Sequence, residues 1–72
     1  MATGAVQFAI ELDKEEDGRW IGEVPDPPGV LAYGQSRDEA IARAQALALR
    51  VLAERLEHGG PPSFLSVSFR AA

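Results

Sequence analysis

Hydrophobic and polar residues alternate in four stretches of the chain, and a period of two is typical of β-strands with one buried face. The first stretch is the clearest, because Val6, Phe8, Ile10 and Leu12 are separated by polar or small residues. The pattern predicts four strands, at about residues 5–13, 18–25, 30–35 and 63–70.

A different period separates the third and fourth strands. From about residue 37 to 58, apolar side chains recur every three or four positions, as in an amphipathic helix. They are Ala40, Ile41, Ala44, Leu47, Ala48, Val51, Leu52 and Leu56. Ser36 is the predicted N-cap and Glu39 completes a capping box, while Gly59 and Gly60 are predicted to end the helix. Such a helix is about 33 Å long, so we expect its far end to extend beyond the sheet.

Two turns connect the first three strands. Asp17 and Gly18 supply the backbone conformation of a tight hairpin. A rigid corner is predicted at residues 25–29, because prolines donate no ladder hydrogen bond, Asp26 can accept local ones and Gly29 tolerates positive φ. The register of the second strand stays open, since Trp20 and Ile21 compete for the interior.

The order of elements predicts an α+β fold, β-β-β-α-β, in a single domain of residues 1–72. A right-handed crossover through the helix makes the fourth strand parallel to the third. Since the third strand runs with the first, the fourth can lie beside the first. The expected spatial order is therefore 3-2-1-4.

Composition narrows the classes of function. The chain has 72 residues, no cysteine and a formal net charge of -4, so it has neither a disulfide framework nor a thiolate metal site. The negative balance disfavours direct DNA binding and favours a basic protein partner. The sequence shows no signal segment and no apolar run long enough to cross a membrane. We expect a cytoplasmic protein.

Catalytic chemistry has little support in the sequence. The strand acids Glu11, Asp13 and Glu23 fit a solvated face better than a two-metal site. Ser36 has no base nearby, because His58, the single histidine, lies at the other end of the helix, beside the helix dipole or solvent. We therefore expect no catalytic residue, no metal and no cofactor.

One helix covers only one face of a four-stranded sheet, so apolar residues remain on the opposite face and on the outside of the helix. Uncovered apolar patches mark association, and oligomerisation is the usual remedy for a core this small. We expect a dimer or tetramer. The candidate residues for an interface, with another copy or with a different partner, are Ile21, Leu31, Tyr33, Leu49, Leu65, Val67 and Phe69.

Four short motifs follow one another along the chain. They are Asp17-Gly18-Arg19-Trp20, Val24-Pro25-Asp26-Pro27-Pro28-Gly29, Gly34-Gln35-Ser36 and Asp38-Glu39-Ala40-Ile41. In this order and spacing they resemble the antitoxin-like domain of the HicB family, over about residues 6–70. The signature residues are Pro25, Asp26, Pro28, Gly29, Gly34, Ser36, Glu39 and Ala40.

The resemblance implies a partial ribonuclease H-like fold used for binding. It also implies that the protein neutralises a small, basic HicA-like ribonuclease toxin by direct contact. Complete HicB proteins bind operator DNA through a C-terminal segment. Because this sequence ends soon after the last predicted strand, we expect no such segment and no direct DNA binding.

Two other interpretations stay open. The alternative is an orphan homo-oligomeric domain with a structural or regulatory role and no toxin partner. A residual metal-dependent nuclease is the third and weakest. No motif of the family carries specific toxin contacts over to this chain.

Overall fold

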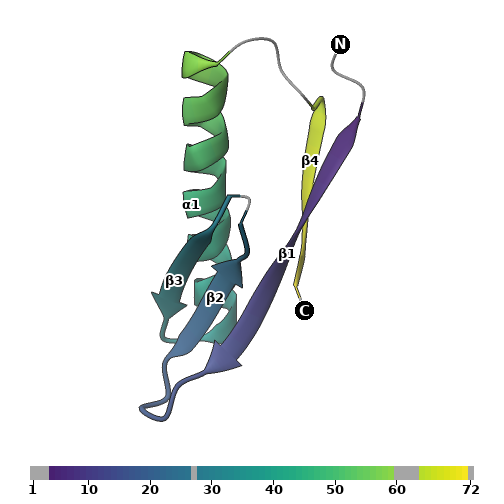
Figure 1. Ribbon diagram of the computed structural model, residues 1–72. Coiled ribbons are helices and arrows are strands. Elements are labelled where there is room, and N and C mark those ends of the chain that lie inside the picture. Colours follow the sequence, from purple (N-terminus) through teal and green to yellow (C-terminus); the bar gives the residue numbers. More distant parts are fainter. Residues whose placement is uncertain (1–3, 27, 60–63, 72) are drawn as a thin grey trace.

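The computed structural model describes residues 4–26, 28–59 and 64–71 of the chain. Four strands form one sheet in the order β3-β2-β1-β4, and one long helix packs on one of its faces (Figure 1). The elements are β1 (Ala5–Lys14), β2 (Trp20–Val24), β3 (Val30–Gly34), α1 (Arg37–His58) and β4 (Ser66–Ala71). Strand β4 pairs parallel with β1, whereas β1–β2 and β2–β3 are antiparallel. The α+β class and the strand order are as the sequence predicts.

Strand β2 begins later than predicted, because the turn before it takes more residues. Glu15 N donates to Arg19 O at 2.7 Å, and Gly18 N donates to Glu15 O at 3.0 Å. Gly18 has a φ of 93°, the left-handed conformation that the Asp-Gly pair predicts. Strand β4 also begins later, at Ser66; its predicted start at residue 63 lies outside the described residues.

The register of β2 decides which of its side chains face the helix. Leu12 lies opposite Gly22, and Gly22 lies opposite Ala32. Trp20, Gly22 and Val24 therefore point inward, and Ile21 points outward. A Cβ on Gly22 would lie 2.9 Å from Ala40 O, so glycine is required where the helix backbone passes over the strand.

The core lies between the inner face of the sheet and a stripe of small residues on α1. Ala40, Ala44 and Ala48 are fully buried, and their short side chains let the helix approach the sheet closely. The sheet contributes large side chains where the helix leaves room. Its buried members are Phe8, Ile10, Val24 and Ala32, and Leu52 completes the core from the helix.

The start of α1 is built as predicted. Glu39 N donates to Ser36 Oγ at 3.1 Å, and Gln35 N donates to Glu39 Oε1 at 2.7 Å. This is a capping box shifted by one residue, because the Glu39 carboxylate accepts a hydrogen bond from the N–H of Gln35 and not from that of the N-cap, Ser36. At the other end Gly59 N donates to Arg55 O at 2.7 Å, so Gly59 is the C-cap; Gly60 lies outside the described residues.

The corner between β2 and β3 is held by its backbone. Gly29 has a φ of 72°, and its N–H donates to Pro25 O at 3.4 Å. Between residues 4–26, 28–59 and 64–71, the Asp26 carboxylate accepts no hydrogen bond. The predicted side-chain brace by Asp26 is therefore wrong, because a carbonyl closes this turn instead. Pro27 lies outside the described residues.

The helix covers only part of the sheet. It lies over β3 and β2. Each of these strands has only five residues, whereas the helix has 22, and its C-terminal half extends beyond them (Figure 1). Leu56 is 45% exposed, so its assignment to the buried stripe is wrong, since this turn has left the sheet behind. The part of the chain that the structure describes contains no helix long and apolar enough to cross a membrane.

Candidate functional site

Three apolar side chains lie together on the face of the sheet opposite α1. Strand pairing places Ile21 directly across from Tyr33, and Leu31, two residues before Tyr33, lies on the same face of β3. Leu31 is 46% exposed and Tyr33 is 40% exposed. We call Ile21, Leu31 and Tyr33 the outer-face patch. The sequence predicts these three residues as interface candidates, and the structure brings them together.

Carboxylate side chains on β1 and β2 lie beside the outer-face patch, on the same face of the sheet. Glu23 pairs with Leu31 on one side and with Glu11 on the other, and Ile21 pairs with Asp13. All three acids are exposed, as the sequence predicts. An apolar centre with a carboxylate border suits a partner that presents an apolar side chain flanked by Lys or Arg.

The paired glutamates carry a cost when nothing is bound, because like charges directly opposite each other on one sheet face repel. We expect Glu23→Gln to raise the free energy of unfolding by roughly 0.2–1 kcal/mol, measured by urea unfolding in low salt. The gain should shrink in about 1 M salt, where charges are screened within about 3 Å. Glu16→Gln, at an exposed position of the β1–β2 turn, is the matched control. Equal effects of both variants would contradict a specific repulsion between Glu11 and Glu23.

The β1–β2 turn supports one edge of the patch. The Arg19 guanidinium lies over the Tyr33 ring, with its central carbon 4.6 Å from the ring centre. Asp17 orients this arginine, since Arg19 Nε donates to Asp17 Oδ2 at 2.8 Å and Arg19 N donates to Asp17 Oδ1 at 3.0 Å. The backbone hydrogen bond, followed by the side-chain bond and the charge of Arg19, lowers the pKa of the Asp17 carboxyl below its usual value. A cation held in this way covers part of the Tyr33 ring and leaves Leu31 uncovered.

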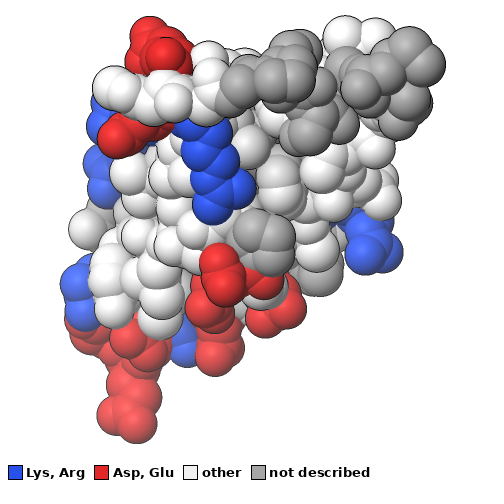
Figure 2. All heavy atoms as spheres, turned by 45° about the horizontal axis from the view of Figure 1, so that its top comes forward, with Lys and Arg blue, Asp and Glu red and all other residues white. Residues whose placement is uncertain are grey.

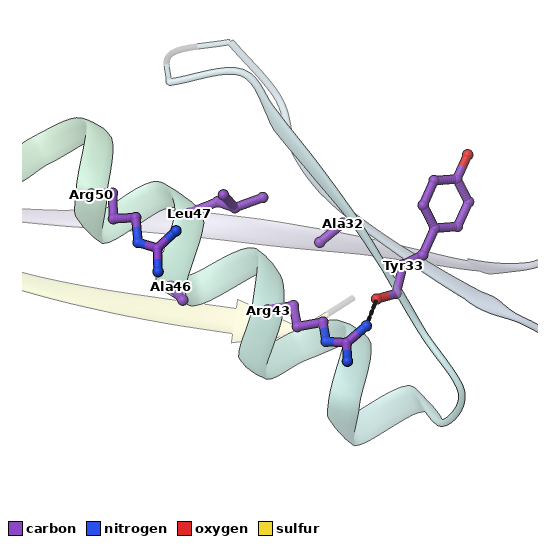
Figure 3. A pocket seen from close by; sticks show the side chains of 6 residues that line it. All are labelled: Ala32, Tyr33, Arg43, Ala46, Leu47 and Arg50. Atoms are coloured by element: carbon purple, nitrogen blue, oxygen red, sulfur yellow. Dashed lines mark hydrogen bonds between the residues drawn. The ribbon is translucent and has the colours of Figure 1, made fainter.

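One carbonyl at the free edge of β3 is bonded by a side chain of the helix. Arg43 Nη1 donates to Tyr33 O at 3.0 Å, while the Tyr33 ring points away to the outer face (Figure 3). A shallow groove of about 350 Å³ lies here between β3 and α1; its lining is Ala32, Tyr33, Arg43, Ala46, Leu47 and Arg50. Arg43 satisfies an edge carbonyl and places a charge beside the edge, two features that oppose strand addition. This observation favours the face of the sheet over its β3 edge as the contact surface.

The other predicted interface residues do not join the patch. Val67 lies opposite Val6 and Phe69 opposite Phe8, so both point to the inner face, and the Phe8 and Phe69 rings are 5.8 Å apart. Their expected place on the face opposite the helix is therefore wrong, because the parallel pairing with β1 turns them inward. Leu65 precedes β4 and is 76% exposed.

Charge is unevenly distributed over the molecule. Nine of the eleven Asp and Glu residues lie between Glu11 and Glu39, against three basic residues there. Acidic side chains gather at the end that carries the β1–β2 turn (Figure 2). Among residues 4–26, 28–59 and 64–71, no three His, Cys, Asp or Glu side chains are grouped closely enough to hold a metal ion. Glu11, Asp13 and Glu23 belong to this acidic group and lie beside the outer-face patch, so the patch has a negative surrounding.

Sequence reasoning missed how Glu11, Glu23 and Arg19 relate to the patch. Alternation along β1 predicts that Glu11 is solvated, but only the register shows that it lies opposite Glu23. The one available signal for Arg19 was its position on the same strand face as Ile21. Its contact with Tyr33 depends on the pairing of β2 with β3, which the pattern alone left open.

No family model matches the chain. The chain is similar to a UPF0150 protein from Archaeoglobus fulgidus. The two sequences are 38% identical over 40 residues, which are 56% of this chain and 58% of that protein. The chain thus matches somewhat more than half the length of this relative. No solved structure matches the chain.

Proposed function

We propose that this chain is a non-enzymatic binding module that occludes a small, basic ribonuclease of the HicA type through the outer-face patch. The observation that carries the proposal is an exposed apolar group bordered by Glu11, Asp13 and Glu23 on a sheet face without a helix. The module acts in the cytoplasm and makes no direct contact with DNA or membranes.

Two resemblances support the class of partner. UPF0150 proteins form the HicB-like family, and the relative from Archaeoglobus fulgidus is a UPF0150 protein. The ordered motifs from Asp17 to Ile41 resemble the HicB antitoxin-like domain independently of that comparison. The resemblance to the HicB domain supports a partner that is a ribonuclease with a basic, RNA-binding surface.

The physical route to binding has two stages. The acidic end attracts a basic protein over long range and accelerates encounter, an effect that falls with added salt. Leu31 and Tyr33 then lose their remaining water contact against the partner, and partner cations pair with Glu11 and Glu23. Relief of the repulsion between these glutamates adds to the affinity. The bound module excludes RNA by occupying the surface that the phosphates need.

Co-expression tests the proposal. The chain is produced with the tagged HicA-type protein encoded beside its gene, and the tagged protein is purified. We expect a stoichiometric complex, and RNA cleavage by the isolated partner should stop at a one-to-one ratio. Failure to co-purify, together with undiminished RNA cleavage in the presence of excess chain, would exclude the proposed function.

A second candidate function rests on a different surface. Leu49 and Leu56 are exposed on the outside of α1, and these residues favour self-association. In this alternative the chain is a homo-oligomeric structural or regulatory domain without a toxin. A stable oligomer combined with no affinity for any HicA-type protein would support it.

A further inference from the structure

A second apolar stripe runs along α1, on the side away from the sheet. The residues of the stripe are separated by four, three, four and three positions, the spacing of a helix that packs against another helix. They are Ala42, Ala46, Leu49, Ala53 and Leu56. All five are exposed, and the two leucines are 46% and 45% exposed.

The sheet cannot cover this stripe. The buried residues of α1 are Ala40, Ala44, Ala48 and Leu52, and at 100° per residue the centre of the outer stripe lies roughly 140° around the helix from theirs. Figure 1 shows the sheet on a single side of α1. Within residues 4–26, 28–59 and 64–71, the leucines of the stripe therefore keep about half of their surface in solvent.

The sizes of the side chains in the stripe are complementary under two-fold symmetry. If two copies of α1 pack antiparallel with the axis near Leu49, each Leu56 meets the small Ala42 of the other copy. Ala46 then lies near Ala53, and the two Leu49 side chains meet at the axis. Large side chains face small ones, so the helices can approach closely. The same patch serves both copies, as a two-fold interface requires.

Charges beside the stripe select the same orientation. Arg43, Arg50 and Glu57 repeat every seven residues along one flank, the positions where paired helices exchange salt bridges. An antiparallel pair brings Arg43 of each copy toward Glu57 of the other, while the same guanidinium donates to Tyr33 O at 3.0 Å and lies 3.6 Å from Glu39 Oε1 of its own copy. In a parallel pair this flank of the two copies would lie on opposite sides of the interface, so Arg43 and Glu57 could not pair between the copies. Only Arg50, near the antiparallel axis, faces a like charge.

We propose that α1 is a self-association surface, and that two copies of this chain form an antiparallel pair through the stripe from Ala42 to Leu56. The inference does not depend on the identity of a toxin. The outer-face patches lie on the opposite sides of the two sheets, so both stay accessible and the dimer is bivalent. The stripe spans about 21 Å of helix, at the low end of interface sizes, which places the expected Kd in the micromolar range.

Sedimentation of the full chain at about 10–100 µM, a range that brackets this Kd, tests the proposal. We expect the wild-type chain to be dimeric and Leu49→Glu to be monomeric, because the substitution places two carboxylates at the axis. Leu65→Glu is the matched control, since Leu65 is 76% exposed and lies outside α1. It should remain dimeric. Circular dichroism and urea unfolding confirm that each variant keeps its fold.

A charge exchange tests the orientation. Glu57→Arg should weaken the dimer by about tenfold in Kd, roughly one ion pair for each half of the interface. Adding Arg43→Glu should restore the affinity, because the pairs between the copies form again with reversed sign. A wild-type monomer throughout the concentration range, or a dimer that Leu49→Glu leaves intact, overturns the proposal. Loss of the dimer without rescue by the double variant overturns the antiparallel arrangement.

Discussion

Replacing Gly34 with alanine is expected to lower the free energy of unfolding by roughly 1–3 kcal/mol or more, the usual cost of overpacking. A Cβ at this position would lie 2.5 Å from Ala40 N and 2.9 Å from Glu39 C. These are backbone atoms of the first helical turn, so no side-chain rotation can relieve the contact. The helix would have to move away from β3, and the packing of Ala40 and Ala44 on the sheet would loosen with it.

Gly4→Ala is the matched control for this substitution. A Cβ on Gly4 meets nothing within 4 Å, and both variants restrict the unfolded chain in the same way. Neither glycine has positive φ, so the difference between the variants reports the close approach alone. Urea unfolding followed by circular dichroism measures it. Because a chain of this length has roughly 4–11 kcal/mol of stability, the predicted loss is large. Equal stability of the two variants would show that α1 does not pack this closely.

The helix was predictable because its signals are local. Ser36 and Glu39 mark its start and Gly59 its end, and the predicted limits, residues 37–58, coincide with Arg37–His58. The strand order also followed from the chain, since a right-handed crossover leaves few arrangements. The far end of α1 extends beyond β2 and β3, as the predicted length of the helix indicates (Figure 1).

The register of β2 was not predictable from its apolar pattern alone, because it depends on a contact between distant segments. Trp20 and Ile21 are both apolar and adjacent, so their pattern favours neither face. Gly22 decides the matter in the structure, since a Cβ at this position would lie 2.9 Å from Ala40 O and 3.3 Å from the Ala44 Cβ. A glycine inside a strand is a sign of close backbone approach, and this sign was available in the sequence.

The candidate site could be predicted in its members but not in its arrangement. Ile21, Leu31 and Tyr33 were expected at an interface, and the structure joins them into one patch. Val67 and Phe69 were expected on the face opposite the helix, but the pairing of β4 with β1 turns them inward. Alternation identifies the two faces of a strand without saying which one meets the helix. The sequence likewise did not show that the exposed leucines of α1 form a separate surface, because only the packing shows which stripe of the helix the sheet buries.

Leu31→Arg is expected to weaken binding of the HicA-type ribonuclease more than any other exposed substitution. The new side chain places a positive charge within the outer-face patch, directly across from Glu23, where it would face a basic partner. Loss of a central apolar contact costs about 2 kcal/mol or more at such positions, which is roughly a 30-fold increase in Kd. Leu31 is 46% exposed and lies on the outer face, so the fold should be unaffected.

Leu65→Arg provides the matched comparison, with the same chemical change and the same change in net charge. Leu65 is 76% exposed and precedes β4, outside the patch. Any general electrostatic repulsion of the partner acts on both variants alike. The difference between them therefore isolates the contribution of the patch.

The central claim is that the uncovered face of the sheet is the surface that recognises the partner. Calorimetric titration of the HicA-type ribonuclease with the wild-type chain, Leu31→Arg and Leu65→Arg tests it most directly. The account predicts that Leu65→Arg binds within a few-fold of wild type and that Leu31→Arg binds at least about 30-fold more weakly. Wild-type affinity in Leu31→Arg, with or without loss in Leu65→Arg, would contradict it.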